Sequence, residues 1–164
     1  EAVRLRAEYP EAQNNLGIAL VQLGRPADAV GPCREAIRLW PEYAKAHNTL
    51  GIALLKSRRL PEAITEFEAA LRLEPGSPDT LVLRRNLGIA LLQSGRLPEA
   101  IAQFQAMLQV DPDSVEAHYH LALALGLSNR PAEAAGHLEE VLRLKPDHAE
   151  ARSALDELPA DRRR

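Results

Sequence analysis

The sequence has one cysteine, few aromatic residues and no long apolar segment, and each shortage excludes a class of protein. Cys33 has no partner with which to form a disulfide within the chain. No apolar run approaches the roughly 20 residues that a membrane-spanning helix requires. Valine, isoleucine and threonine never alternate with polar residues over a strand's length, and aromatic residues make up only 4%. The composition therefore predicts an all-α protein.

Neither sign of charge is gathered into one stretch of the chain. The 20 Lys and Arg residues are interleaved with 23 Asp and Glu residues, which leaves a net charge of −3. Nucleic acid is not expected as a ligand, because its recognition needs a stripe of basic side chains. The first residues also show no basic segment followed by an apolar one, so no signal peptide is visible and the cytoplasm is the default expectation.

A repeat of 34 residues is the main feature that is present. The pair Leu16-Gly17 recurs as Leu50-Gly51 and Leu87-Gly88, and it becomes Leu121-Ala122 in a fourth copy. Alanine and proline recur at matching intervals after each pair, at Ala29, Ala36 and Pro41, then Ala63, Ala70 and Pro75, then Ala100 and Pro112, then Ala134 and Pro146. A fixed period of this length indicates an array of small stacked units.

Each repeat contains two segments with helical spacing of apolar residues. In the first copy one segment ends before Gly24, which suits a left-handed helix terminus, and Pro26 suits the start of the second segment. The face expected to pack into the array carries Ala12, Leu16, Ala19, Leu20 and Leu23. We therefore predict two antiparallel helices per repeat, with the recurrent glycine and alanine at the points where helices cross closely.

This order of Leu-Gly, Gly, Ala, Ala and Pro at 34-residue spacing resembles the tetratricopeptide repeat. The resemblance implies a right-handed superhelical solenoid of antiparallel helix pairs. It divides the chain into a helix end left from a preceding repeat (1–9), four repeats (10–43, 44–77, 78–114 and 115–148), a C-terminal capping helix (149–158) and a tail (159–164). Because residues 1–9 match the end of a second helix, we expect the chain to be a piece of a longer protein.

Two departures from the repeat carry structural predictions. The third repeat has three extra residues around Pro75-Gly76-Ser77-Pro78, and we interpret Ser77 as an N-cap that lengthens the next helix by almost one turn; a longer loop is the alternative. Arg58 and Asn129 stand where Gly24 and Gly95 end the first helices. Arginine tolerates a positive φ poorly, so the second hairpin is expected to turn differently or to carry strain.

A second apolar stripe lies opposite the first on the first helix of each repeat. A helix that packed only onto its own repeat would be polar there, yet Ile18 and Val21 are matched by apolar residues in the later copies. In the family resembled, first helices line the concave side of the superhelix, so the stripe would form the floor of a groove. The alternative is that adjacent first helices shield these side chains from one another.

The candidate binding residues follow from the groove interpretation. The apolar floor would supply affinity for an amphipathic helix or an extended segment, and the polar residues beside it would supply orientation. The predicted partner-binding set is Asn14, Ile18, Val21, Lys45, Asn48, Ile52, Leu55, Arg85, Ile89, Leu92, Tyr119 and Leu123.

Other chemistry is poorly supported by the sequence. Asn15 and Asn86 resemble part of the asparagine ladder of O-GlcNAc transferase repeats, but Thr49 and His120 interrupt it. The five histidines lie in different segments or face different directions, so neither a metal nor another cofactor is expected. Cys33 falls on the core stripe and is expected to be a buried thiol. The sequence offers no catalytic set of residues.

Three functional hypotheses remain. The first is a non-enzymatic scaffold that binds a protein or peptide along its concave face, without nucleic acid or membrane insertion. The second is the substrate-presenting or assembly region of a larger enzyme, such as a glycosyltransferase. The third is self-association, as a weak homodimer through an apolar edge at Ala2, Val3 and Leu5.

Overall fold

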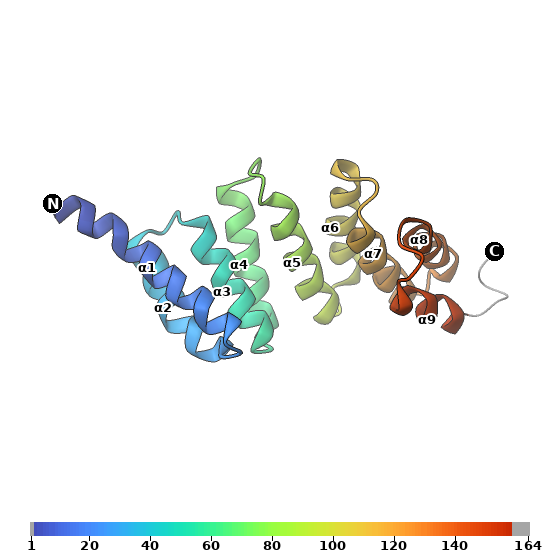
Figure 1. Ribbon diagram of the computed structural model, residues 1–164, viewed down its shortest axis with the longest axis horizontal. Coiled ribbons are helices and arrows are strands. Elements are labelled where there is room, and N and C mark those ends of the chain that lie inside the picture. The colour runs from blue at the N-terminus through green and yellow to red at the C-terminus, as the bar shows by residue number, and fades with distance from the viewer. Residues whose placement is uncertain (1, 159–164) are drawn as a thin grey trace. The chain divides into compact units, whose positions relative to one another are not determined.

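The computed structural model describes the backbone of residues 2–158 and the side-chain surroundings of residues 9–158 (Figure 1). Every regular element in this range is an α-helix, which confirms the all-α prediction. The helices are α1 (Ala2–Gln22), α2 (Pro26–Leu39), α3 (Ala44–Lys56), α4 (Leu60–Leu73), α5 (Thr80–Gln93), α6 (Leu97–Val110), α7 (Val115–Leu127), α8 (Pro131–Leu144) and α9 (Ala149–Glu157).

The chain forms two compact units, residues 1–90 (unit 1) and residues 91–164 (unit 2), with the boundary inside α5. In unit 1, α1 packs against α2 and α3, α2 also packs against α3, and α3 packs against α4. In unit 2, α6 packs against α7, α7 against α8, and α8 against α9. Consecutive helices therefore pair as hairpins within each unit, as the repeat predicts.

The turns inside the hairpins use the left-handed backbone conformation. Gly24 and Gly95 have φ values of 73° and 77°, and Arg58 and Asn129 adopt φ values of 62° and 57° at the matching positions. The conformational strain predicted at Arg58 is thus present, because a Cβ makes this region unfavourable. After the turn, each second helix has a proline at its first or second position and an acidic residue in its first turn. Both features favour a helix start.

Small residues at the helix crossings allow the hairpins to close. A Cβ on Gly51 would lie 2.6 Å from the ring of Phe67, and one on Gly17 would lie 2.3 Å from Sγ of Cys33. Ala63 and Phe67 have no exposed surface. The close approach of α3 to α4 is therefore possible only because residue 51 lacks a side chain, which confirms the packing role predicted for this glycine.

The helix boundary predicted between residues 9 and 10 is absent. Residues 2–9 continue into α1 without a break, and Pro10 lies inside that helix. Pro10 matches Ala44, the first residue of α3, so the sequence does contain a residue suited to starting a helix there. A continuous helix across residues 2–9 satisfies the backbone hydrogen bonds without a turn.

The first apolar stripe is also placed differently in α1 than we predicted. Ala12, Ala19 and Leu23 are exposed, and Leu16 is 48% exposed. The matching residues of α3, which has a hairpin before it, are buried: Ala46, Leu50, Ala53 and Leu54. The stripe is therefore buried in α3, which packs against α1 and α2 as well as α4, and largely exposed in α1.

The insertion before the third repeat lengthens a loop rather than a helix. α5 begins at Thr80 and is one residue longer than α3. The Ser77 hydroxyl oxygen accepts a hydrogen bond from the Asp79 backbone N–H at 3.2 Å, and the Thr80 hydroxyl donates to the Glu74 carbonyl at 3.3 Å. These local bonds stabilise a turn ahead of α5, so the predicted extension of the helix by almost one turn is wrong.

Candidate functional site

The second apolar stripe of unit 1 lies on one face of α1, α3 and α5. Ile18 is 38% exposed, while its counterparts on the other first helices are partly buried. By contrast, Leu50 and Leu54 on the opposite side of α3 are 2% and 1% exposed. The partly exposed residues of this stripe, which we call the unit 1 face, are Ile18, Val21, Ile52, Leu55 and Ile89.

Polar side chains beside the unit 1 face form hydrogen bonds between neighbouring helices. The Asn86 amide nitrogen donates to the Asn48 side-chain oxygen at 3.2 Å, which connects α5 to α3. The Arg85 guanidinium in turn donates to the Asn86 side-chain oxygen at 3.3 Å. Lys45 is exposed on α3. The asparagine at position 86 thus has a structural role, and Asn48 and Arg85 are already oriented by it.

Asn14 does not line an open groove. Its residue surface is only 2% exposed, and its side-chain oxygen Oδ1 is buried without a hydrogen-bond partner. Burial, followed by the charge of Glu11, raises the pKa of Tyr43, and a hydrogen bond with Asn14 partly opposes this shift. Asn14 is therefore buried in the structure, in which α2 and α3 pack against α1, and its contact with a partner stays an untested prediction.

The remaining predicted binding residues belong to unit 2. Leu92 and Leu123 are partly buried, like their counterparts in unit 1. Tyr119 lies between two histidines, with its ring centroid 5.6 Å from that of His120 and 5.0 Å from that of His148. Tyr119 therefore connects α7 to the start of α9, and burial raises the pKa of its hydroxyl.

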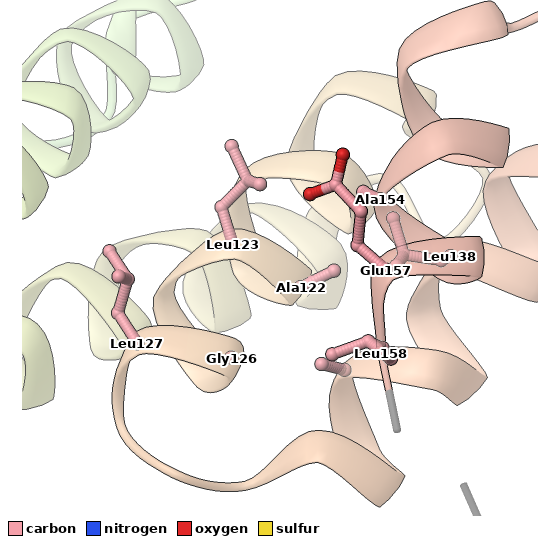
Figure 2. Close-up of a pocket in the computed structure, with 9 residues that line it drawn as sticks. Ala122, Leu123, Gly126, Leu127, Leu138, Ala154, Glu157 and Leu158 are labelled. Carbon is pink, nitrogen blue, oxygen red and sulfur yellow. The ribbon is translucent and has the colours of Figure 1, made fainter. Parts of the chain in front are cut away.

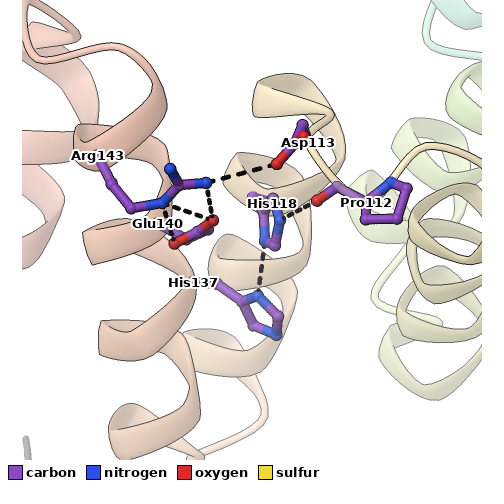
Figure 3. Close-up of polar contacts among 6 residues, drawn as sticks. All are labelled: Pro112, Asp113, His118, His137, Glu140 and Arg143. Atoms are coloured by element: carbon purple, nitrogen blue, oxygen red, sulfur yellow. Dashed lines mark hydrogen bonds and ion pairs between the residues drawn. The ribbon is translucent and has the colours of Figure 1, made fainter.

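A pair of histidines, His118 buried and His137 partly buried, is the first feature that sequence reasoning missed. The two Nδ1 atoms of His118 and His137 lie 2.9 Å apart, and Nε2 of His118 lies 2.9 Å from the Pro112 carbonyl oxygen (Figure 3). Because a carbonyl only accepts, Nε2 of His118 carries a proton and its Nδ1 accepts when the ring is neutral. His137 then donates from Nδ1. Burial, followed by the nearby charge of His118, lowers the pKa of His137.

The matching position of the second repeat holds a different pair. His47 is bonded through Nδ1 to the Glu66 carboxylate at 2.7 Å and through Nε2 to the Pro41 carbonyl at 2.9 Å. The bond to Glu66 raises the pKa of His47. Both pairs are separated by 19 residues. Because His47 and His118 occupy the same repeat position, this common spacing could have revealed the pair of His118 and His137 from the sequence.

A pocket of about 280 Å³ in unit 2 is the second feature that was missed. Figure 2 shows its walls, which α7, α8 and α9 provide: Ala122, Leu123, Gly126, Leu127, Ala134, Leu138, Ala154, Glu157 and Leu158. Glu157 is the one charged residue among them, so the pocket offers an apolar surface beside a carboxylate.

The other chemistry considered from the sequence can be checked within residues 9–158. In that range no group of three or more His, Cys, Asp or Glu side chains could hold a metal ion. Cys33 is fully buried as predicted, and burial raises the pKa of its thiol to about 11. None of the described helices is both long enough and apolar enough to cross a membrane. Ala2, Val3 and Leu5, on which the homodimer hypothesis rests, lie outside the residues whose side chains are described.

Paired helices with glycine or alanine at the crossings define an α-helical repeat protein. Models of the tetratricopeptide repeat match residues 1–44 and 85–149, and also residues 42–113. The chain belongs to the tetratricopeptide repeat family. Proteins of this family are in general non-enzymatic scaffolds for protein–protein interaction. No curated protein matches the sequence.

Solved structures share the fold at low sequence identity. MamA from Desulfovibrio magneticus RS-1 is 20% identical with a TM-score of 0.82, and the match covers 90% of this chain and 81% of that one. PilF from Pseudomonas aeruginosa is 24% identical with a TM-score of 0.78, over 93% and 68% of the two chains. Cut9, in a hetero-tetramer with Hcn1, is 24% identical with a TM-score of 0.80, over 89% and 29%. These similarities concern the fold alone.

Proposed function

We propose that this chain is a non-enzymatic scaffold that binds a peptide or helical segment of another protein on the apolar faces of its first helices. The observation that carries the proposal is the unit 1 face. Ile18, Ile52 and Ile89 recur on three successive first helices and keep part of their surface exposed, while the core residues of α3 and α5 are nearly closed to solvent. Regularly spaced apolar side chains suit a partner with similarly spaced apolar residues.

The polar residues beside the unit 1 face support this role. Asn48, Asn86 and Arg85 are joined by hydrogen bonds, which limits their freedom before any partner binds. Preorganised side chains lose less conformational entropy on binding. Exposed Lys45 adds a cationic group on the same helix as Ile52. Cut9 is an example of a protein with this fold that assembles with another protein.

The proposal is tested by capture of partners from a soluble extract of the source organism, followed by quantitative mass spectrometry. Ile52→Glu combined with Ile89→Glu places two carboxylates on the unit 1 face. Leu39→Glu combined with Leu73→Glu is the matched control, because these leucines are 38% and 36% exposed and lie at the ends of second helices.

We expect the face variant to lose most of the proteins that the unaltered chain captures, and the control variant to keep them. Helix content and melting temperature of both variants should stay close to those of the unaltered chain. Equal capture by the face variant and the unaltered chain would exclude this face as the binding surface.

A further inference from the structure

The pocket of unit 2 exists because three repeat positions depart from their counterparts. Gly126 stands where Leu55 and Leu92 stand in other repeats, and Leu138 stands where Phe67 and Phe104 stand. Both changes remove side-chain volume from the same place, since both residues line the pocket. Two of the residues that line the pocket are therefore ones at which this repeat differs from the second and third repeats.

The third departure is the early end of α9. This helix has 9 residues, whereas α7 has 13. Leu158 has an extended backbone with φ of −70° and ψ of 136°, and the residue before a proline favours such a conformation. Pro159 follows in the sequence and accounts for the stop. Leu158 therefore lines the pocket as the residue that ends α9 instead of continuing it (Figure 2).

The charge at the pocket is of one sign. Glu157 occupies the position held by Ile18, Ile52, Ile89 and Leu123 in the other repeats, so a carboxylate replaces an apolar side chain. Its oxygen accepts a hydrogen bond from the Ser153 hydroxyl at 3.3 Å, and no Lys or Arg lines the pocket. Residues 91–158 contain five Lys or Arg against eleven Asp or Glu, so the surroundings of the pocket favour a cationic partner.

We propose that this pocket takes one branched apolar side chain, such as leucine, from a cationic peptide segment whose neighbouring arginine or lysine pairs with Glu157. The volume is below the roughly 300–1,000 Å³ of pockets that enclose a drug-sized ligand, and it suits a single side chain. This inference rests on the proposed scaffold function and adds a specificity: a leucine next to a basic residue. It concerns unit 2, whereas the capture experiment above concerns unit 1.

The test uses a short synthetic peptide with one leucine flanked by arginines in a glycine-serine background. Binding is followed in the full chain by the methyl NMR signals of Leu123, Leu127 and Leu158. One comparison peptide replaces the leucine by serine, and another replaces the arginines by glutamates. We expect saturable shifts with the first peptide, roughly tenfold weaker binding without the leucine, and about threefold or more weaker binding with glutamates.

Substitutions in the chain locate the site. Gly126→Leu restores the residue found in other repeats, and no atom lies within 4 Å of a Cβ at this position, so the fold should tolerate it. Gly136→Leu on α8 is the matched control, with equally open space. Glu157→Gln should remove the preference for arginine, whereas Glu139→Gln, at an exposed position of α8, should leave it.

The proposal is overturned if Gly126→Leu binds the peptide as the unaltered chain does, or if the glutamate peptide binds equally well. Two further results would assign the pocket to another occupant. Stronger binding after Arg162, Arg163 and Arg164 are replaced by serine would identify the chain's own tail, and methyl shifts that depend on protein concentration without peptide would identify a second copy. If the peptide does not bind the pocket but the capture experiment on the unit 1 face is positive, the pocket proposal is wrong and the scaffold function still stands.

Discussion

The hairpin of α3 and α4 in unit 1 and the hairpin of α7 and α8 in unit 2 use the same repeat positions for different chemistry. At the helix crossing, the first pairs Gly51 with Phe67 and the second pairs Ala122 with Leu138. The first fills its interior with an aromatic ring, while the second combines a smaller side chain with an open pocket. The comparison shows that residues at the crossing must be exchanged together, because the space available to one depends on the other.

Both hairpins carry a histidine at the same repeat position, but the two histidines have different partners. His47 pairs with a carboxylate in unit 1, and His118 pairs with a second histidine in unit 2. The first pair favours a protonated ring, because Glu66 is acidic. The second disfavours protonation of His137, because that ring is partly buried and faces His118. The two matching pairs thus contain histidines whose pKa values shift in opposite directions, His47 upward and His137 downward.

Substitutions at the helix crossing are expected to change the free energy of unfolding the most. Gly51→Ala brings a methyl group against the Phe67 ring and should cost about 1–3 kcal/mol of overpacking, partly offset by the roughly 1 kcal/mol better helix propensity of alanine. Denaturant unfolding measures the net loss. In the double variant with Phe67→Leu, the alanine should cost less than it does alone, because Ala and Leu occur together in α7 and α8.

Gly136→Ala is the control for helix propensity, since nothing lies within 4 Å of a Cβ there. It should stabilise the chain by up to about 1 kcal/mol. If Gly51→Ala stabilised the chain equally, the close approach of α3 to α4 would not exist.

The histidine pairs should give pH effects of opposite sign. The raised pKa of His47 means that its pair stabilises the fold below the unfolded pKa of histidine and loses this contribution as pH rises through the folded value. The lowered pKa of His137 means that its contribution is present above the unfolded pKa and is lost as pH falls toward the folded value. Arg72 also acts on His47, and Glu133 and Glu140 act on His137.

Unfolding free energies between pH 5 and pH 8, which bracket the usual histidine pKa of about 6.5, measure these effects. Glu66→Gln should remove a stabilisation that the unaltered chain shows at the acidic end. His137→Gln should remove a destabilisation at that same end. Parallel pH profiles for both variants would show that the two pairs do not differ in the way described.

Substitutions in the turns of the two hairpins are expected to change stability the least. Arg58 and Asn129 both have a positive φ, but asparagine tolerates this conformation better than arginine does. Arg58→Gly should therefore stabilise the chain by about 1 kcal/mol, and Asn129→Gly should have a smaller effect. Thermal unfolding of the two variants makes the comparison. A larger gain at position 129 would contradict the assigned strain.

Most of the fold could be predicted from the repeat, because helix pairs and turns depend on residues close in sequence. Gly24, Gly95, Arg58 and Asn129 all adopt the expected turn conformation. The surroundings of α1 could not be predicted in the same way. Leu16 matches the buried Leu50, yet it is 48% exposed, because burial depends on whether another hairpin covers that face.

The candidate sites could be predicted from the sequence even less completely than the surroundings of α1. The recurrence of Ile18, Ile52 and Ile89 marked a face of the first helices, but Asn14 proved to be buried. The pocket depends on residues that break the repeat, namely Gly126, Leu138 and Glu157, and a search for recurring residues passes over them. Positions that depart from a repeat are thus as informative about function as those that keep it.

The central claim is that the unit 1 face is a surface for a partner and not a second core. The most direct test compares the unfolding free energy of Ile52→Glu with that of Leu50→Glu, two residues apart on α3. We predict a loss of about 1 kcal/mol or less for Ile52→Glu and more than about 4 kcal/mol for Leu50→Glu, which buries a charge. Similar large losses for both variants would show that the stripe is core and would contradict the proposed function.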